Sequence, residues 1–128
     1  EVKDWDEYMA HCQVDPFNPN KFIQDKDRSF VEMPAAAPQL WHTLNPDVPH
    51  GQVEHSTWHS ELLNNDRQIW VYTPHDYSTE DGPYPLLLLF DGDVFTSDVH
   101  APTIFDNLIA AGRIPPMLVV MLDSPNRQ

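Results

Sequence analysis

The sequence predicts an α/β fold in which an antiparallel hairpin leads into a parallel strand–helix–strand unit, so that the sheet is mixed. Two uninterrupted apolar runs, Leu86–Phe90 and Met117–Leu122, carry this prediction, because a strand buried on both faces of a parallel sheet shows no polar alternation. Two strands joined by a helix in this way are parallel, with a right-handed crossover. We expect Leu86–Phe90 to be the central strand.

The connecting helix is predicted over residues 102–112. This run begins with proline and ends with glycine, which suit the first turn and the terminator of a helix. Ile104, Leu108 and Ala111 share one face at helical spacing, and we expect that face to point inward.

The hairpin is predicted before these elements. Gln52–Leu63 and Arg67–Thr73 are rich in residues that favour strands, and Asn64–Asp66 supplies turn residues between them. The apolar run that follows the hairpin stops at an acidic turn, residues 91–93. In open α/β sheets, ligands bind outside the carboxyl ends of the strands, so the sequence predicts the site at this turn.

The first fifty residues differ in composition from the rest. Residues 5–12 carry apolar side chains at helical spacing, and Ser29–Met33 suggests a short strand. Residues 34–50 hold four prolines and are interpreted as an extended linker. Two domains are therefore expected, one on each side of this linker.

Composition excludes several classes of partner and scaffold. The formal charge of −13 argues against nucleic acid and against an anionic membrane surface. A single cysteine, Cys12, cannot form an internal disulfide, and no apolar run approaches the roughly 20 residues that span a bilayer. The chain begins with Glu1 and contains no Gly-x-Ser-x-Gly nucleophile turn, so we expect it to be a portion of a longer protein.

Several short motifs together resemble a known family, although no single one is specific. In chain order, the matching stretches are Val14–Pro19, Val31–Pro34, Arg67–Pro74, Leu89–Gly92 and Ile114–Met117. With their spacing, they resemble the enterochelin esterase family of bacterial siderophore hydrolases, which belongs to the α/β-hydrolase superfamily. The resemblance covers nearly the whole chain.

This resemblance implies a domain arrangement. Residues 1–33 would be the carboxyl end of an amino-terminal β-sandwich domain, 34–50 a Pro-rich linker, and 51–128 the first part of an α/β-hydrolase catalytic domain. The family's Ser nucleophile, acidic partner and His would all lie beyond Gln128. We expect the chain alone to be inactive for that reason.

The resemblance also implies a substrate and a location. Such enzymes cleave the ester bonds of a ferric catecholate siderophore in the cytoplasm and so release iron. The partner would be this anionic, iron-bound small molecule. Iron would be part of the substrate, and no cofactor or catalytic metal is expected.

Five residues are candidates for the site. A backbone N–H near Gly92 or Asp93 would form half of an oxyanion hole, because one such donor follows the third strand in α/β-hydrolases. Alternatively, Gly92 only permits the turn. Arg127 could bind the anionic substrate through its guanidinium, or be an ordinary solvated residue. Phe95 and His100 could line the pocket.

The histidines do not predict a metal site. His55 and His59 lie on one face of a regular strand, but their separation along it is about 13 Å, too far to share one ion.

Two other classes of function remain open. Asp91-x-Asp93 after an apolar strand resembles the first motif of Mg²⁺-dependent phosphatases, in which the first Asp attacks phosphorus. A non-catalytic α/β binding module is the third possibility. In that case the sheet would have an open edge and an uncovered face, and we expect such a chain to associate.

Overall fold

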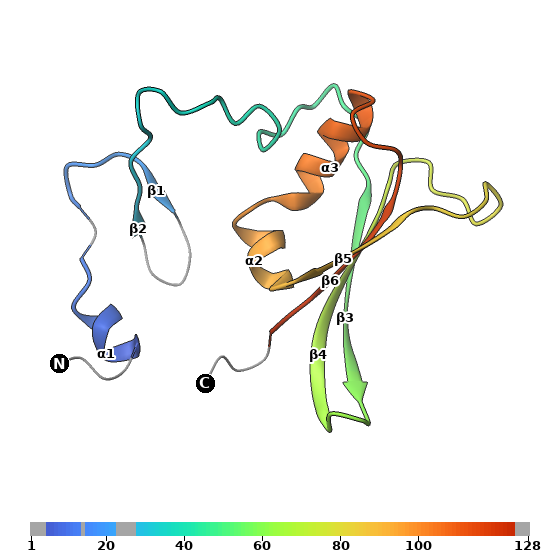
Figure 1. Cartoon of the computed structure of the whole chain (residues 1–128), viewed down its shortest axis with the longest axis horizontal. Coiled ribbons are helices and arrows are strands. Elements are labelled where there is room, and N and C mark those ends of the chain that lie inside the picture. Colours follow the sequence, from blue (N-terminus) through green and yellow to red (C-terminus); the bar gives the residue numbers. More distant parts are fainter. Residues whose placement is uncertain (1–4, 14, 23–27, 125–128) are drawn as a thin grey trace. The chain divides into compact units, whose positions relative to one another are not determined.

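A computed structural model describes residues 5–13, 15–22 and 28–124, which fall into two compact units, Glu1–Ala37 and Pro38–Gln128. Figure 1 shows the elements of each unit. Among the described residues, no helix is long and apolar enough to cross a membrane.

The first unit contains little regular structure. Helix α1 covers Trp5–Ala10, in the predicted region, and strands β1 (Lys21–Phe22) and β2 (Arg28–Ser29) pair antiparallel. The strand expected over Ser29–Met33 is wrong beyond its first residue, since the following residues are irregular and exposed. The assignment of this region to a β-sandwich domain stays a prediction.

The second unit is built on a four-stranded sheet. Its strands are β3 (Gln52–Ser60), β4 (Asn65–Thr73), β5 (Leu86–Phe90) and β6 (Leu118–Leu122). Their order in the sheet is β3-β4-β6-β5 (Figure 1). The β3–β4 hairpin and the β4–β6 pair are antiparallel, whereas β5 and β6 are parallel. The predicted mixed sheet and parallel crossover are confirmed.

The hairpin turn lies earlier than expected. Asn65 and Asp66 belong to β4 and pair with Ser60 and His59, so the prediction of a turn at residues 64–66 is wrong in its position. Asn64 adopts a left-handed conformation, with φ of 47°, which asparagine tolerates better than most residues. The turn can therefore end at Asn64 and leave the next two residues free to pair.

Strand β5 is not central in this sheet. It lies at the edge of the described strands and pairs with β6 alone. Leu86, Leu88 and Phe90 are 68%, 49% and 63% exposed, so the prediction of a strand buried on both faces is wrong for this chain. The reason is that the helices of the unit cover only one face of the sheet.

Two helices connect β5 to β6. The predicted helix is confirmed with slightly earlier bounds, as α3 over Ala101–Ala110. Gly112, with φ of 65°, follows its end, and the N–H of Arg113 donates to the carbonyl of Leu108 at 2.9 Å, a Schellman-type termination. Helix α2, Gly92–Ser97, was not predicted, because its six residues are too few to show a periodic pattern.

The buried face of α3 is rotated from the predicted one. Phe105, Asp106 and Asn107 are buried, whereas Ala111 is exposed. The inward stripe expected from Ile104, Leu108 and Ala111 is therefore wrong. The two polar residues can be buried because each has hydrogen-bond partners, a stabilisation that apolar periodicity does not reveal.

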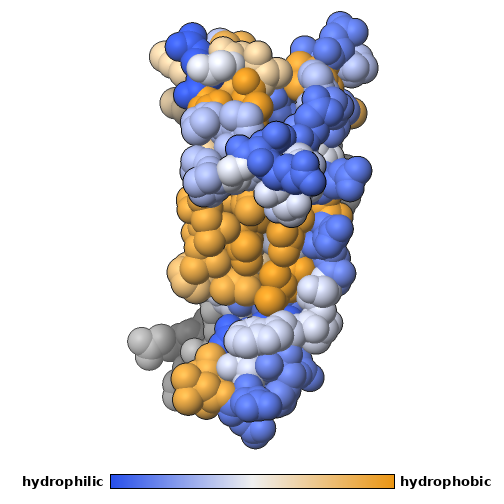
Figure 2. Space-filling view, turned by 90° about the vertical axis from the view of Figure 1, so that its right-hand side faces the viewer, coloured by the Kyte–Doolittle hydropathy of each residue, from blue (hydrophilic) through white to orange (hydrophobic). Residues whose placement is uncertain are grey.

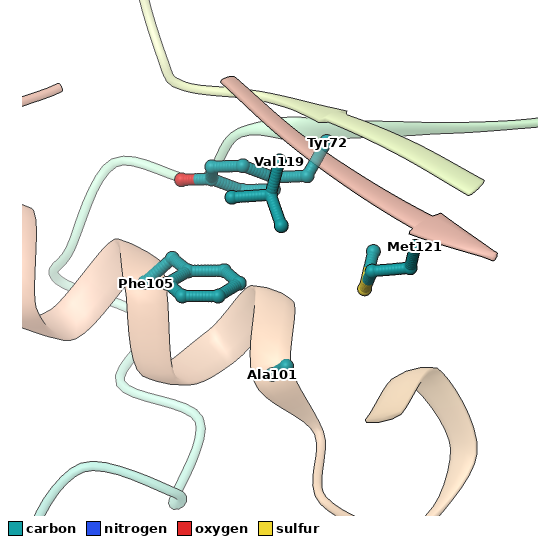
Figure 3. Close-up of a cluster of buried hydrophobic side chains, with 5 residues drawn as sticks. All are labelled: Tyr72, Ala101, Phe105, Val119 and Met121. Atoms are coloured by element: carbon teal, nitrogen blue, oxygen red, sulfur yellow. The ribbon is translucent and has the colours of Figure 1, made fainter. Parts of the chain in front are cut away.

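The core lies between α3 and the sheet. Figure 3 shows Tyr72, Val119 and Met121 on the sheet side, facing Ala101 and Phe105 of α3. The rings of Tyr72 and Phe105 are 5.4 Å apart. Trp70, Leu87, Leu89 and other half-buried residues extend this layer.

The opposite face of the sheet is uncovered by the described residues. By strand pairing, its apolar side chains are Leu86, Leu88, Phe90, Leu118, Val120, Leu122, Ile69 and Val71. Figure 2 shows them as a band of hydrophobic surface across the middle of the view. The uncovered face and open edge expected from the sequence are therefore present.

Much of the proline-rich segment packs with the second unit. Residues 38–50 cluster with the sheet, and the side-chain amide of Asn107 donates to the carbonyls of Trp41 and Thr43 at 2.7 and 3.0 Å. These contacts show that the later half of the segment is held against α3. The domain boundaries proposed from the sequence stay a prediction.

Candidate active site

The parallel pair defines one edge of the sheet at which two strands end. Because β5 and β6 run in the same direction, Phe90 and Leu122 are paired at their carboxyl ends. Asp91 follows β5 in a left-handed conformation (φ 57°, ψ 47°) and turns the chain directly into α2. The predicted site turn, residues 91–93, therefore lies at the carboxyl edge of the parallel strands. Its last two residues are the first two residues of helix α2.

Gly92 is packed against the sheet at this edge. A Cβ atom there would lie 2.8 Å from the Met121 carbonyl carbon, 2.9 Å from Trp70 Cε3 and 3.0 Å from the Leu122 nitrogen. The space that a side chain would occupy is thus filled by protein. Packing against the sheet is therefore a physical reason for glycine at this position.

The amino end of α2 presents backbone donors. The N–H of Phe95 donates to the Asp91 carbonyl at 3.0 Å, which is the first i to i−4 bond of this helix. The N–H groups of Gly92 and Asp93 precede the first intrahelical donor, the N–H of Phe95, so they have no acceptor within the helix. Two adjacent N–H groups at a strand end are chemically suited to stabilise a developing negative charge.

The other predicted site residues differ in their surroundings. Phe95 is half-buried and packs against the core. His100 is exposed and lies at the amino end of α3 with φ of 53°. Arg127 lies outside the described residues.

Asp123 extends the pairing of β6 with β4 by one residue at this edge. Its N–H donates to the carbonyl of Gln68 at 3.0 Å, and its Oδ1 accepts the Gln68 N–H at 2.9 Å. The carboxylate thereby continues the β4–β6 ladder past the last strand residue. Its role in this unit is to hold the carboxyl end of β6 on β4.

The hairpin adds a side-chain cluster that the sequence did not reveal. His55 stacks on Trp70 with ring centroids 4.7 Å apart and planes 10° from parallel. The Nε2 of His55 donates to Oε1 of Gln68 at 2.8 Å, and the Thr57 hydroxyl donates to the same oxygen at 3.1 Å. Their cross-strand register places these side chains on the face that carries α2.

His59 has a different partner. Its Nδ1 is 2.7 Å from Oδ1 of Asp66, its cross-strand neighbour. Over the part of the chain that the structure describes, no group of three or more His, Cys, Asp and Glu is arranged to hold a metal ion.

A pocket of about 300 Å³ lies away from the predicted edge. Its lining residues are Pro49, Tyr72, His75, Asp106, Ile109 and Ala110. Tyr72 pairs with Val119, near the start of β6, so this pocket is at the amino edge of the parallel strands. The pocket lies at the amino edge of the parallel strands, whereas the backbone N–H groups of α2 lie at the carboxyl edge.

A buried hydrogen-bond network forms the base of this pocket. Oδ1 of Asp106 accepts the Tyr72 hydroxyl at 2.7 Å and the Gly51 N–H at 2.8 Å, and Oδ2 is 3.1 Å from Nδ1 of His50. Burial, reinforced by the hydrogen bond to Asp106, raises the pKa of the Tyr72 phenol well above its ordinary value. Tyr72 is therefore a neutral donor that joins β4 to α3.

The mixed sheet, with helices between its parallel strands, is an α/β arrangement similar to that of solved esterases. A family model described as "Putative esterase" matches residues 60–128, more than half of the chain. The chain belongs to this family.

Individual relatives are also esterases. The iron(III) enterobactin esterase of Yersinia enterocolitica is 34% identical over 93% of this chain and 36% of the relative. That of Escherichia coli K12 is 26% identical over 94% of this chain and 30% of the relative. The chain thus spans about a third of the length of these relatives.

Solved structures of esterases are similar in fold to this chain. The enterobactin esterase of Shigella flexneri, determined in the presence of enterobactin, superposes with a TM-score of 0.68 at 26% identity, covering 88% of this chain and 29% of that one. A feruloyl esterase module from Clostridium thermocellum, complexed with sinapinate, shares the fold with a TM-score of 0.55 over 68% of this chain and 31% of that one.

Proposed function

We propose that this chain supplies the oxyanion-side part of a serine esterase whose nucleophile lies beyond residue 128. The observation that carries the proposal is the amino end of α2, where Gly92 is packed against β6 and Trp70 at the carboxyl edge. In α/β-hydrolases one oxyanion donor comes from the chain after the third strand. Here the third strand of the sheet is β5, and Gly92 and Asp93 follow it.

The reaction would proceed in two steps. The Ser oxygen attacks the ester carbonyl carbon, a His takes the Ser proton, and the carbonyl oxygen becomes an oxyanion held by the N–H groups of α2. The intermediate then expels the alcohol, which receives the proton from the His, and leaves an acyl-enzyme. Water hydrolyses the acyl-enzyme by the same route. Losing one oxyanion donor typically lowers the rate by roughly 10²–10³.

The proposed substrate is a ferric catecholate siderophore, from which ester cleavage releases iron. The relatives named as enterobactin esterases support this choice. Iron is then part of the substrate and not a catalytic metal, and the proposed location is the cytoplasm. Arg127 and His100 are proposed substrate contacts. Phe95 is proposed as a pocket wall in addition to its packing against the core.

The proposed architecture follows the same resemblance. Residues 1–33 would end a β-sandwich domain, and 51–128 would begin the catalytic domain, with the proline-rich segment between them. The hydrogen bonds from Asn107 to the segment at Trp41 and Thr43 would then fix how the chain enters the catalytic domain.

The full-length protein should be assayed on ferric enterobactin and on a simple aryl ester, with a serine-reactive phosphonate as probe. We expect the protein to cleave the siderophore, and we expect the phosphonate to abolish this cleavage. Absence of both labelling and ester cleavage would favour a binding module. Mg²⁺-dependent release of phosphate from a test ester would instead favour Asp91 as a nucleophile.

A further inference from the structure

We propose that the pocket at the amino edge of the parallel strands binds a small primary ammonium ion with a compact apolar body. Its volume of about 300 Å³ lies at the lower end of the range for small-molecule sites. The proposal goes beyond the esterase function, because the proposed oxyanion donors lie at the carboxyl edge of the same strands.

The walls of the pocket are mostly apolar. The pocket forms where the chain before β3, the end of β4 and the last turns of α3 meet, and hydrocarbon lines most of it, from Pro49, Tyr72, Ile109 and Ala110. Figure 3 shows the hydroxyl end of Tyr72 directed away from Met121 and the carboxyl end of β6. A ligand that fills this space must therefore bury an apolar body.

The base of the pocket is a buried carboxylate that can accept one more hydrogen bond. The Asp106 side chain is only 7% exposed. Its Oδ1 accepts two hydrogen bonds, from the Tyr72 hydroxyl and the Gly51 N–H. Its Oδ2 is 3.1 Å from Nδ1 of His50, its one hydrogen-bond partner among the described residues. Because each carboxylate oxygen has two lone pairs, Oδ2 has room for a donor from a ligand.

The charges around the pocket favour a cation. Among the described residues that line it, none carries an ammonium or guanidinium group. At the rim, Nδ1 of His75 is 2.9 Å from Oδ2 of Asp76, which places a second carboxylate beside the lining. The chain as a whole has a formal charge of −13. These carboxylates attract a cationic ligand and repel an anionic one.

A primary ammonium ion with an apolar body meets both conditions. One N–H can donate a charge-assisted hydrogen bond to Oδ2 of Asp106, while the hydrocarbon body covers Ile109 and Ala110. The remaining N–H groups can stay hydrated, because Pro49 and His75 at the lining are exposed to solvent. A neutral alcohol of the same shape would fill the space but form a weaker hydrogen bond.

The test is a calorimetric titration of the full-length protein at pH 8, where a primary alkyl ammonium keeps its proton. The probe is cyclohexylmethylamine, and cyclohexylmethanol is its neutral counterpart. The amine should bind, and the alcohol should bind at least about tenfold more weakly. Asp106→Asn removes the charge, keeps an acceptor oxygen and should weaken binding of the amine by about 10- to 100-fold.

Two neighbouring alanines provide a matched pair of variants that leaves the Asp106 hydrogen bonds intact. Ala110 and Ala111 are both exposed, and both line a second hollow beside residues 40–48, but of the two only Ala110 lines the proposed site. Ala110→Leu should fill the pocket and weaken binding of the amine at least about tenfold. Ala111→Leu should change it less than about twofold. This pair decides the question even if Asp106→Asn fails to fold.

Absence of amine binding to the folded protein, or equal binding of the amine and the alcohol, would overturn the proposal. Equal effects of Ala110→Leu and Ala111→Leu would overturn it too, because the amine would then occupy the second hollow or another surface. Binding is measured without turnover. A protein that binds the amine in this pocket and cleaves no ester would therefore contradict the esterase proposal alone.

Discussion

The hydroxyl of Tyr72 donates a 2.7 Å hydrogen bond to Oδ1 of Asp106 and joins the middle of the sheet to α3 across the core. The same oxygen accepts the Gly51 N–H, at the entry to β3. One buried carboxylate thus connects three segments that are far apart in the sequence, and it sits beside the pocket at the amino edge.

Removing this carboxylate should destabilise the second unit, Pro38–Gln128. Asp106→Ala leaves the Tyr72 hydroxyl and the Gly51 N–H without their acceptor, which we expect to lower the free energy of unfolding by about 2–4 kcal/mol. Asp106→Asn keeps an acceptor oxygen and should cost less. Urea denaturation of the full-length protein measures both, and equal stability of the two variants would contradict the assigned hydrogen bonds.

Tyr72 should also make stability depend on alkaline pH. Its pKa is raised in the folded protein, so its contribution is fully present below the unfolded value of about 10 and is lost as the pH rises above it. Tyr72→Phe should therefore flatten the fall in stability above about pH 10. Unfolding curves at several pH values test this, and an unchanged slope would show that Tyr72 ionises as readily in the folded state.

Gly92 should tolerate no side chain. Gly92→Ala places a Cβ within 3.0 Å of two backbone atoms and of Trp70, and we expect a loss of about 1–3 kcal/mol from overpacking together with a loss of esterase activity. Gly112 provides the control, because nothing lies within 4 Å of its Cβ position and only its φ of +65° opposes substitution. Gly112→Asn should lower stability by less than about 1 kcal/mol and leave activity intact.

The oxyanion assignment can be tested at the exposed neighbour of Gly92. Asp93→Pro removes one N–H in the first helical turn, where proline is tolerated, whereas Asp93→Ala keeps it. We expect kcat to fall by roughly 10²–10³ in the proline variant only. Circular dichroism should first show that both variants are folded. A similar kcat in the two would then mean that the Asp93 N–H is not part of the oxyanion hole.

The 128-residue chain expressed alone should self-associate through its open sheet face. Leu88→Glu introduces a charge into the uncovered apolar band and should shift the chain toward monomer in sedimentation experiments. Leu62→Glu is the control, because Leu62 is 94% exposed in the hairpin turn, outside the sheet. If both substitutions act alike, association depends on general charge and not on this face.

The sequence by itself determined the mixed sheet, the parallel crossover and the edge at which the candidate donors lie. These follow from local signals: apolar runs such as Leu86–Phe90, a proline at the start of α3, and Gly112 at its end. Each signal depends on residues that are close in the chain, so it can be recognised without knowing what packs against it.

Only the tertiary structure decided which faces are buried and which polar groups meet. An apolar run has no pattern that tells an edge strand from a central one, so the exposure of Leu88 and Phe90 depended on where the helices lie. Asp106 is buried in α3 because Gly51 and Tyr72, 55 and 34 residues away in the sequence, donate hydrogen bonds to its carboxylate. The His55–Trp70 stack likewise depends on strand register, which pairing across the hairpin fixes and single-strand periodicity does not.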